Sequence, residues 1–587
     1  MGGCGKPRIE LDETCGNVGA AAMVGQDFDD VPTLTGAHAD KTERTLARVL
    51  QGLAEPALHR PQPAAKRGVG VFVRGMPANP MPIARHAGTV PPPMFELRHN
   101  RLVQATERLT SRALRPTTVV IFMAVIWSTI FIRLCWLRQD RFGTFGFDLG
   151  IYDQGIWLMS RFKDPFVTIR GLELFGHHMN PILLGFVPFY WLGAGPHFLA
   201  AAQVLIQAAG VFAVYFLARD LLEDEWLAAA LSSILLLHPT YQFLTWEYFH
   251  PDSLAVTPLL FAYWAARRRR WGWFAVAAVV ALACKEDVAL SMFMLGVLIA
   301  VAWNRRVGLI TAGASFAWFA IATRLLIPAF NGIGPFYDSF FNEFGSKPGQ
   351  IVGNVSAHPL KALRVATRPD RIDYYRMMLA PVAFLPLAGL PVLAIAAPMI
   401  GINALSSFPY QRQIMWHYSA LPLAAIVLAT VEAIRLVGRR PGARRFLVGL
   451  VVATSFATTV AWGPSPLSVK YRTGLWPLRP DPRGATKHHA IDMIPRNATV
   501  TATYYFAPHI DHRERIYEFP VPFKEANWGV HGENLHDPAR VQWLVIDRAL
   551  VSEVDLPVLS KILDGQFKIR FERQGIFVAK RVAPPPT

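Results

Sequence analysis

Two carboxylates stand close together just after the first long apolar run of the chain. The segment FGFDLGIYDQ covers residues 145–154 and contains Asp148 and Asp153. A carboxylate beside a membrane is unfavourable unless another group compensates it or a reaction uses it. In a site, a carboxylate can take the proton of a reacting hydroxyl group, and cations can hold a departing phosphate. The two acids are therefore the first candidates for catalytic residues.

Further ionisable residues follow other apolar runs in short polar motifs. The motifs are HHMN at 177–180, WEYFHPD at 246–252, CKED at 284–287 and YQRQIMWHY at 410–418. Ionisable groups near a bilayer usually face each other or a protein cavity. We expect the motifs to meet in one polar cavity, which would bind a substrate through these residues: His177, His178, His250, Asp252, Lys285, Glu286, Asp287, Arg412 and His417.

Each motif also has a structural explanation. Asp148 could cap a helix over 151–163, and Asp153 would be favoured in the first turn of that helix. Asp252 could likewise cap the helix that follows it. Lys285 with Glu286 or Asp287 could be an ion pair that closes a hairpin of two spans. These alternatives stay open at this stage.

A metal site is a further alternative for the first loop. His177, His178 and Asp148 are residue types that bind divalent cations. Adjacent helical residues, however, point roughly 100° apart, so both histidines rarely bind one ion. The sequence therefore predicts no metal site and no cofactor.

The composition is that of a membrane protein. Hydrophobic residues make up 52% of the 587 residues and charged residues only 17%, and the mean hydropathy is +0.26. Soluble chains have about a quarter of their residues charged. The apolar blocks are long enough to cross a bilayer. The net charge of +17 does not indicate nucleic-acid binding, because Lys and Arg gather at the ends of these blocks. We expect a mainly α-helical, polytopic transmembrane protein.

The apolar blocks predict about eleven spans. They are 117–136, 196–218, 226–244, 253–267, 271–284, 288–304, 307–328, 375–388, 390–405, 416–436 and 445–463. With this count, the Arg clusters at 101–115, 267–270, 305–306 and 439–445 fall on one side. The positive-inside rule makes that side cytoplasmic. The protein is then a multi-pass protein of the inner or plasma membrane, with a cytoplasmic N-terminus and an extracytoplasmic C-terminus.

Three regions complete the predicted organisation around the transmembrane domain at 117–463. Residues 1–95 are rich in Gly, Ala, Pro and charge, which predicts a disordered cytoplasmic tail. The first outer loop, 137–195, contains the segments 151–163 and 177–196, for which we expect helices lying on the outer leaflet. Two strand patterns, a helix and a terminal hairpin predict a small extracytoplasmic α/β domain at 470–582.

The motifs together resemble a known family. FDLGIYDQGIW, HHMNPILL, FHPD, KED and FPYQRQIMWHYSA are similar to a family of predicted bacterial membrane proteins of unknown function, seen often in actinobacteria. The resemblance covers about residues 120–580. In layout it is similar to the glycosyltransferase-C superfamily, which includes protein mannosyltransferases and lipid A aminoarabinose transferases. The resemblance implies that Asp148 takes the place of the catalytic acid and 177–196 that of the second juxtamembrane helix. The spacing Asp-x4-Asp departs from the adjacent or Asp-x-Asp acids of that superfamily.

The resemblance implies a glycosyltransferase whose donor is a sugar on a polyprenyl phosphate, since nucleotide sugars are absent outside the cell. Asp148 would act as the base of an inverting transfer to an extracytoplasmic acceptor. Lys285, Arg412 and His417 would hold the donor phosphate. The expected partners are this lipid-linked donor, membrane lipids and the acceptor.

Two other function classes remain open. A transporter or lipid flippase would place its ionisable residues near the bilayer midplane. A non-catalytic scaffold would not need the acids.

Overall fold

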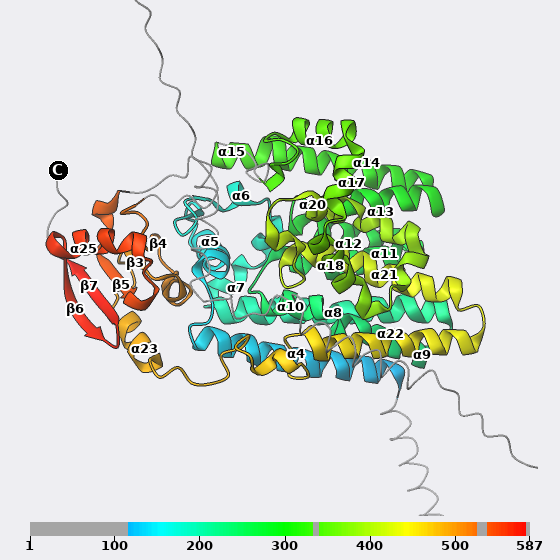
Figure 1. Ribbon diagram of the computed structural model, residues 1–587, viewed down its shortest axis with the longest axis horizontal. Coiled ribbons are helices and arrows are strands. Elements are labelled where there is room, and N and C mark those ends of the chain that lie inside the picture. Colours follow the sequence, from blue (N-terminus) through cyan, green and yellow to red (C-terminus); the bar gives the residue numbers. More distant parts are fainter. Residues whose placement is uncertain (1–114, 333–339, 525–536, 583–587) are drawn as a thin grey trace, which may run out of the picture. The chain divides into compact units, whose positions relative to one another are not determined.

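The computed structural model describes residues 115–332, 340–524 and 537–582 (Figure 1). The tail predicted at 1–95 lies outside these residues. The described chain consists of a bundle of apolar helices, followed by a smaller region that contains a β-sheet.

Six helical segments are long and apolar enough to cross a membrane. Three of them are single helices: Pro116–Asp140 (α4), Pro196–Leu222 (α8) and Pro441–Trp462 (α22). The other three are composite: Arg305–Asn331 (with α14, Arg305–Ile321, and α15, Ile327–Asn331), Leu385–Leu405 (ending in α20, Ala397–Leu405) and His417–Val437 (containing α21, Ala420–Val437). A seventh is the bent pair Glu225–Leu237 (α9) and Pro239–Trp246 (α10), which meet at 49°. Pro239 begins α10 at this bend, as expected for a residue that cannot continue a helix. Three shorter helices complete the bundle: Pro251–Arg267 (α11), Trp271–Cys284 (α12) and Val288–Ala302 (α13).

The segment 375–388, predicted as a span, is not one continuous helix. It begins in Pro369–Leu379 (α18) and continues through two 3-10 turns, Ala380–Val382 and Leu385–Gly389. Ala383 and Phe384 between the turns have φ of 52° and 57°, which an α-helix excludes. The prediction of a helix here is wrong because its prolines interrupt the backbone hydrogen bonding. The number of eleven spans is therefore not confirmed.

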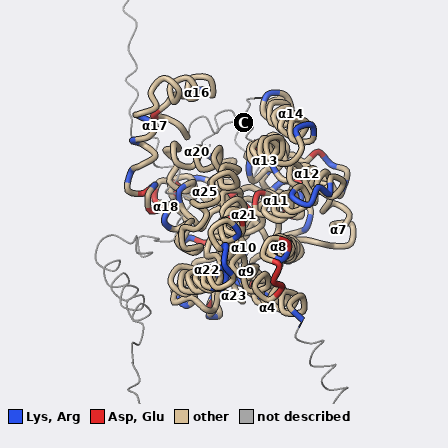
Figure 2. The backbone as a smooth tube through the Cα atoms, turned by 90° about the vertical axis from the view of Figure 1, so that its right-hand side faces the viewer, with Lys and Arg blue, Asp and Glu red and all other residues tan. Residues whose placement is uncertain are grey.

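The Arg clusters at 267–270, 305–306 and 439–445 lie at one end of the bundle, which we call the basic end (Figure 2). Arg267 and Arg435 are both 2.7 Å from Glu432, and Arg268 is 3.5 Å from Asp220. These contacts join loops that are far apart in the sequence. Figure 2 looks onto this end and shows Lys and Arg at the ends of α11, α12 and α14. The positive-inside rule predicts that the basic end faces the cytoplasm.

The polar motifs lie at the opposite end, the loop end. Here α4 is followed by a π-helical turn at Gly146–Gly150 and by Ile151–Ser160 (α5), the helix expected over 151–163. The segment 177–196 forms no long helix. It divides into a 3-10 turn, Pro181–Gly185, and Val187–Trp191 (α7), each with a proline at its start. Leu184, Trp191 and Leu192 are exposed on these pieces, as expected for segments at a membrane surface.

The C-terminal region contains a five-stranded sheet in the order β4-β3-β5-β7-β6. The strands are Val500–Ala502 (β3), Ile516–Glu518 (β4), Trp543–Asp547 (β5), Phe567–Arg573 (β6) and Ile576–Arg581 (β7). β3 pairs in parallel with β4 and β5, whereas β7 runs antiparallel to β5 and β6. The expected strands, hairpin and helix (Leu556–Gly565, α25) are all present, and β4 is a strand that was not expected.

The two faces of the sheet belong to different cores. Leu544 and Ile546 pack with Leu559 of α25 in a core of their own. Val545 and Val578, on the other face, belong to the same buried cluster as the helix bundle. This alternation follows from the period of two along a strand. The sheet therefore packs one face against elements that belong to the membrane part of the chain.

Candidate functional site

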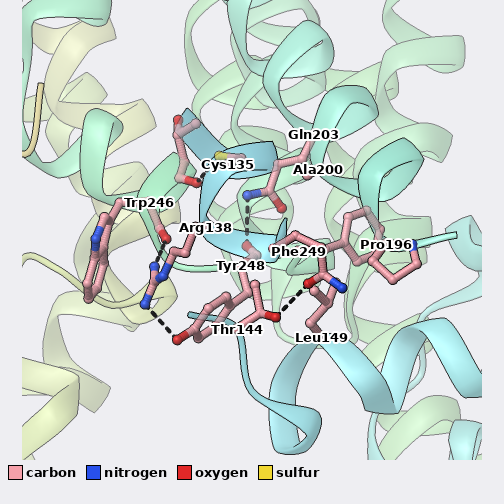
Figure 3. A pocket seen from close by; sticks show the side chains of 12 residues that line it. Cys135, Arg138, Thr144, Leu149, Pro196, Ala200, Gln203, Trp246, Tyr248 and Phe249 are labelled. Carbon is pink, nitrogen blue, oxygen red and sulfur yellow. Dashed lines mark hydrogen bonds between the residues drawn. The ribbon is translucent and has the colours of Figure 1, made fainter. Parts of the chain in front are cut away.

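The loop end is held together by Arg138, in the last turn of α4. Its guanidinium donates to the backbone oxygen of Trp246 at 2.5 Å and to the Tyr248 hydroxyl at 2.6 Å (Figure 3). A third bond, at 2.8 Å, goes to the Gly143 oxygen. A cavity of about 20 Å³ lies beside these groups, enough for about one water molecule. Arg138 thus fixes the end of α4 to the end of α10, and with it the turn that carries Asp148.

Six ionisable residues from four loops form a continuous set of contacts at this end. We call them the loop cluster: Asp148, Glu247, His250, Asp252, Lys285 and His417. His250 Nε2 is 3.7 Å from Asp148 Oδ1, and the His250 ring stacks on His417 at 4.3 Å. His417 Nδ1 lies 2.7 Å from Glu247, and His417 Nε2 lies 3.6 Å from Asp252. Lys285 Nζ completes the set at 2.9 Å from Asp252.

The histidine pair of the first loop lies next to the loop cluster. His178 Nδ1 is 2.9 Å from Glu286 Oε1, and the backbone N–H of Met179 donates to the other oxygen at 3.0 Å. The His177 ring packs against His178 at 4.5 Å. Asp287, the last predicted residue of this group, is 3.4 Å from Lys285. The first loop is therefore docked onto the turn between α12 and α13.

Asp148 has the surroundings of an ionised carboxylate. Burial acts to raise its pKa, but the neighbouring His250 and His417 rings outweigh this effect, so the pKa is lowered. The side chain of Asp148 is 29% exposed, whereas those of the other members of the loop cluster are at most 14% exposed. Asp148 is thus charged at neutral pH and is the member of the cluster most open to a reactant.

Two other acids of this end, Glu247 and Asp287, have raised pKa values. Burial raises the pKa of Glu247 to about 8, and burial also raises the pKa of Asp287. Burial acts to lower the pKa of Lys285, but the carboxylates of Asp252 and Asp287 raise it well above its usual value. Near neutral pH, Lys285 is therefore charged and its closest carboxylate partner is Asp252.

Arg412 is not brought into the loop cluster. Its Nε is 2.7 Å from Asp370, and its Nη1 donates to the backbone oxygens of Ser406 and Phe408 at 2.7 and 3.1 Å. Arg371 shares the same aspartate at 2.5 Å. The Arg412 side chain therefore ties the loop before α21 to the start of α18.

Asp153 also lies outside the loop cluster. It sits in the first turn of α5, fully buried, and accepts a hydrogen bond from the Tyr190 hydroxyl. Its other oxygen is 3.0 Å from His512 Nε2 of the C-terminal region, beside Asp511. We call these four residues the interdomain cluster.

The helix caps, first-turn acids and metal site considered from the sequence have different outcomes in the structure. The residue preceding α5 is Gly150, and no side-chain oxygen of Asp148 caps that helix. Asp153 and Asp252 do lie in first helical turns, but both also pair with other side chains. His178 pairs with Glu286, and the ligand atoms that converge among the described residues do not include those of His177 or His178. Ligand atoms of Glu247, His250 and His417 lie within 4.8 Å of one another and are suited to a divalent cation.

Comparisons with known proteins identify the family. A model described as "Predicted membrane protein (DUF2079)" matches residues 138–577, or 440 of the 587 residues. The chain belongs to the DUF2079 family. This confirms the resemblance read from the motifs, with limits close to the expected 120–580. No curated protein matches this DUF2079 chain in sequence.

Three solved structures are similar to the chain. ArnT from Cupriavidus metallidurans bound to undecaprenyl phosphate is 12% identical with a TM-score of 0.44, over 80% of this chain and 99% of ArnT. ArnT in the apo state is 14% identical with a TM-score of 0.38, over the same shares. The Archaeoglobus fulgidus oligosaccharyltransferase, in complex with Zn and sulfate, is 15% identical with a TM-score of 0.35, over 79% of this chain and 73% of that chain. Because all three TM-scores lie below 0.5, these likenesses give no evidence for a shared activity.

Several residues of the DUF2079 site were not predicted as site residues. Glu247 lies within the WEYFHPD motif, beside His250 and His417 in the structure. Its place in this motif is the signal that could have identified it as a site residue. Arg138 and the pair Asp511–His512 carry no local signal, because their partners are more than 100 residues away. Glu518 of β4 approaches the turn Gly146–Gly150, which carries Asp148 and which we call the acid turn. A Cβ on Gly146 would clash with the Oε1 of Glu518.

Proposed function

We propose that this DUF2079 protein is an integral membrane glycosyltransferase that uses a polyprenyl-phosphate sugar as donor. The observation that carries the proposal is the meeting of Asp148, His250 and Lys285, which come from different loops, at one end of the helix bundle. A site at the ends of membrane helices suits a donor whose lipid stays in the bilayer. The acceptor would approach from the side that carries the C-terminal sheet.

In the proposed reaction, Asp148 takes the proton of the acceptor hydroxyl as its oxygen attacks the anomeric carbon. The new C–O bond forms while the bond from that carbon to the phosphate oxygen breaks. The phosphate leaves with the electron pair as polyprenyl phosphate, and the configuration inverts. Asp148 suits this role because it is ionised and is the most exposed member of the loop cluster.

Lys285 is the proposed cation for the leaving phosphate. Its ammonium is 2.9 Å from Asp252 and 3.4 Å from Asp287. In this proposal, the donor phosphate replaces Asp287, the more distant of the two carboxyl groups, and Asp252 stays paired with Lys285. His177 and His178, which lie next to the loop cluster, are proposed to contact the donor as well.

The charge distribution favours a transferase over a transporter. In α8, α11 and α21 the charged residues lie within the first or last two turns, and α12 and α13 contain none. A transporter that binds an ionic substrate would place ionisable groups near the middle of such helices. The charges of these helices instead gather at the two ends of the bundle.

The proposal is tested with purified protein and labelled polyprenyl-phosphate sugars of several kinds. We expect release of polyprenyl phosphate from at least one donor, and loss of this release in Asp148→Asn. Movement of a lipid or solute across liposomes, with no release from any donor, would overturn the transferase in favour of the transporter. The sugar that is released identifies the donor.

A further inference from the structure

The interdomain cluster brings two buried carboxylates together from distant parts of the chain. Asp153 lies on α5 and is 0% exposed, and Asp511 follows Ala507–Ile510 (α24) in the C-terminal region and is 2% exposed. One carboxylate oxygen of each, Oδ2, accepts no hydrogen bond from the described residues. Two ionised carboxylates that are sealed from water and face each other are strongly unfavourable, so such a pair either shares a proton or holds a cation between its oxygens.

The nearby arginine does not supply this charge through direct contact. Arg513 follows the cluster, but its guanidinium donates to the backbone oxygens of Ala498 at 2.9 Å and Pro495 at 3.2 Å, and to that of Ile510. Lys163, on the same side of the first loop, pairs with the exposed Glu514. Within the described chain, the basic side chain that contacts Asp153 is therefore His512.

His512 converges with both acids on one point. One ligand atom each of Asp153, Asp511 and His512 lies within 4.8 Å of the others. His512 Nε2 is 3.0 Å from Asp153 Oδ2 and makes no hydrogen bond to the described residues. Carboxylate and imidazole side chains are both ligands of zinc and of other divalent first-row metals.

We propose that Asp153, Asp511 and His512 bind one divalent metal ion of the zinc class, which fastens α5 to the C-terminal region. Three protein ligands leave one position for water. His512 is 37% exposed, which gives the ion a route of entry. This site is separate from the loop cluster, and the proposal does not depend on the proposed sugar transfer.

Neighbouring side chains hold Asp153 and His512 in fixed orientations, as expected for metal ligands. The Tyr190 hydroxyl donates to Asp153 Oδ1, the oxygen that does not face the histidine. Trp157 stacks on the His512 ring at 5.9 Å and 19°. Bonds of this kind orient metal ligands, and their loss weakens metal binding by about 10–100-fold. Tyr190→Phe is therefore a mild variant that keeps all three ligands.

The test measures metal content and zinc affinity of the purified full-length protein, without donor or acceptor. The protein is stripped with a chelator, titrated with zinc chloride or manganese chloride, and assayed by mass spectrometry for metal per chain. We expect wild type to bind one equivalent that Asp511→Asn and His512→Gln lose, and Tyr190→Phe to bind it about 10–100-fold more weakly. Asp481→Asn, which breaks an ion pair to Lys487 elsewhere in the C-terminal region, is the matched control and should bind as wild type.

His417→Gln separates this site from the candidate set in the loop cluster. We expect His417→Gln to keep the one equivalent of metal per chain that His512→Gln loses. Equal metal content in wild type, Asp511→Asn and His512→Gln would overturn the proposal, and so would loss in His417→Gln alone. If the ligand variants fail to fold, an affinity of Tyr190→Phe equal to that of wild type overturns it as well.

Discussion

Asp148 and Asp153 stand five residues apart in the sequence but belong to two different sites. Asp148 is partly exposed among loops of the helix bundle, whereas Asp153 is sealed between α5 and the C-terminal region. Asp148 lies on the π-helical turn Gly146–Gly150 and Asp153 in the first turn of α5, and the two side chains contact different partners. The comparison teaches that a motif with two acids does not by itself imply a paired acid site.

The largest expected effect is on the transfer rate, which should depend on Asp148 more strongly than on Asp153. Asp148→Asn keeps the shape of the side chain but removes the proton acceptor, so we expect the transfer rate to fall about 10²–10⁴-fold at unchanged unfolding temperature. Steady-state release of polyprenyl phosphate measures this rate. Asp140→Asn, which breaks an exposed pair with His197 at the end of α4, is the control and should leave the rate unchanged.

Asp153→Asn should show the opposite pattern. It changes a group that does not contact the loop cluster, so we expect reduced stability of the docked C-terminal region and a smaller loss of rate. A rate loss equal to that of Asp148→Asn, in a protein of normal stability, would show that the two acids act as one site.

The second prediction concerns the buried pair at the centre of the loop cluster. Lys285→Met leaves Asp252 without its closest partner at 2.9 Å. Breaking a buried ion pair from one side typically costs about 3–5 kcal/mol, and we expect a loss of that order in the free energy of unfolding in detergent. Lys524→Met breaks an exposed pair with Asp555 and should change it by only about 0–1 kcal/mol. Similar values for both variants would mean that Lys285 is solvated and not paired as described.

The third prediction tests how the C-terminal region holds the acid turn. A Cβ on Gly146 would lie 2.3 Å from Glu518 Oε1 and 2.6 Å from Ala507 Cβ. Gly146→Ala should therefore reduce stability by about 1–3 kcal/mol, the usual effect of overpacking, and lower the transfer rate because Asp148 moves with the turn. Thermal unfolding and the release assay measure the two effects. Gly185→Ala, with nothing within 4 Å of its added carbon, should be neutral, and two neutral variants would contradict the described contact.

The smallest expected effect depends on pH. Burial raises the pKa of Glu247 from 4.5 to about 8, so the folded protein holds this proton more tightly than the unfolded chain. Its contribution to stability is present below pH 4.5 and is lost as the pH rises through about 8. Glu247→Gln cannot lose this proton, so its unfolding free energy should fall less over that range than that of wild type.

Melting curves of both proteins between pH 5 and 9 measure this difference. A wild type that gains stability relative to Glu247→Gln as the pH rises would mean that Glu247 is ionised in the folded protein. That result would favour a cation held by Glu247, His250 and His417.

The sequence by itself determined the class of the protein and the main helices. Apolar blocks between Arg clusters predict spans because only helices and closed barrels satisfy the backbone in lipid. The blocks predicted at 117–136, 196–218 and 445–463 lie in long helices of the structure. The same pattern was misleading at 375–388, where the apolar content was sufficient but prolines and two positive φ angles break the helix. The strands of the C-terminal region followed from their alternation, apart from the three-residue β4.

Only the tertiary structure decided which polar residues share a site. The sequence grouped Asp148, Asp153 and Arg412 in one cavity, yet these residues lie in three separate networks. Direct contacts depend on helix rotation and on how distant loops dock, and a sequence motif contains neither. His512 reaches Asp153 across 359 positions of the chain, so only the packing of the sheet against the first loop could join them.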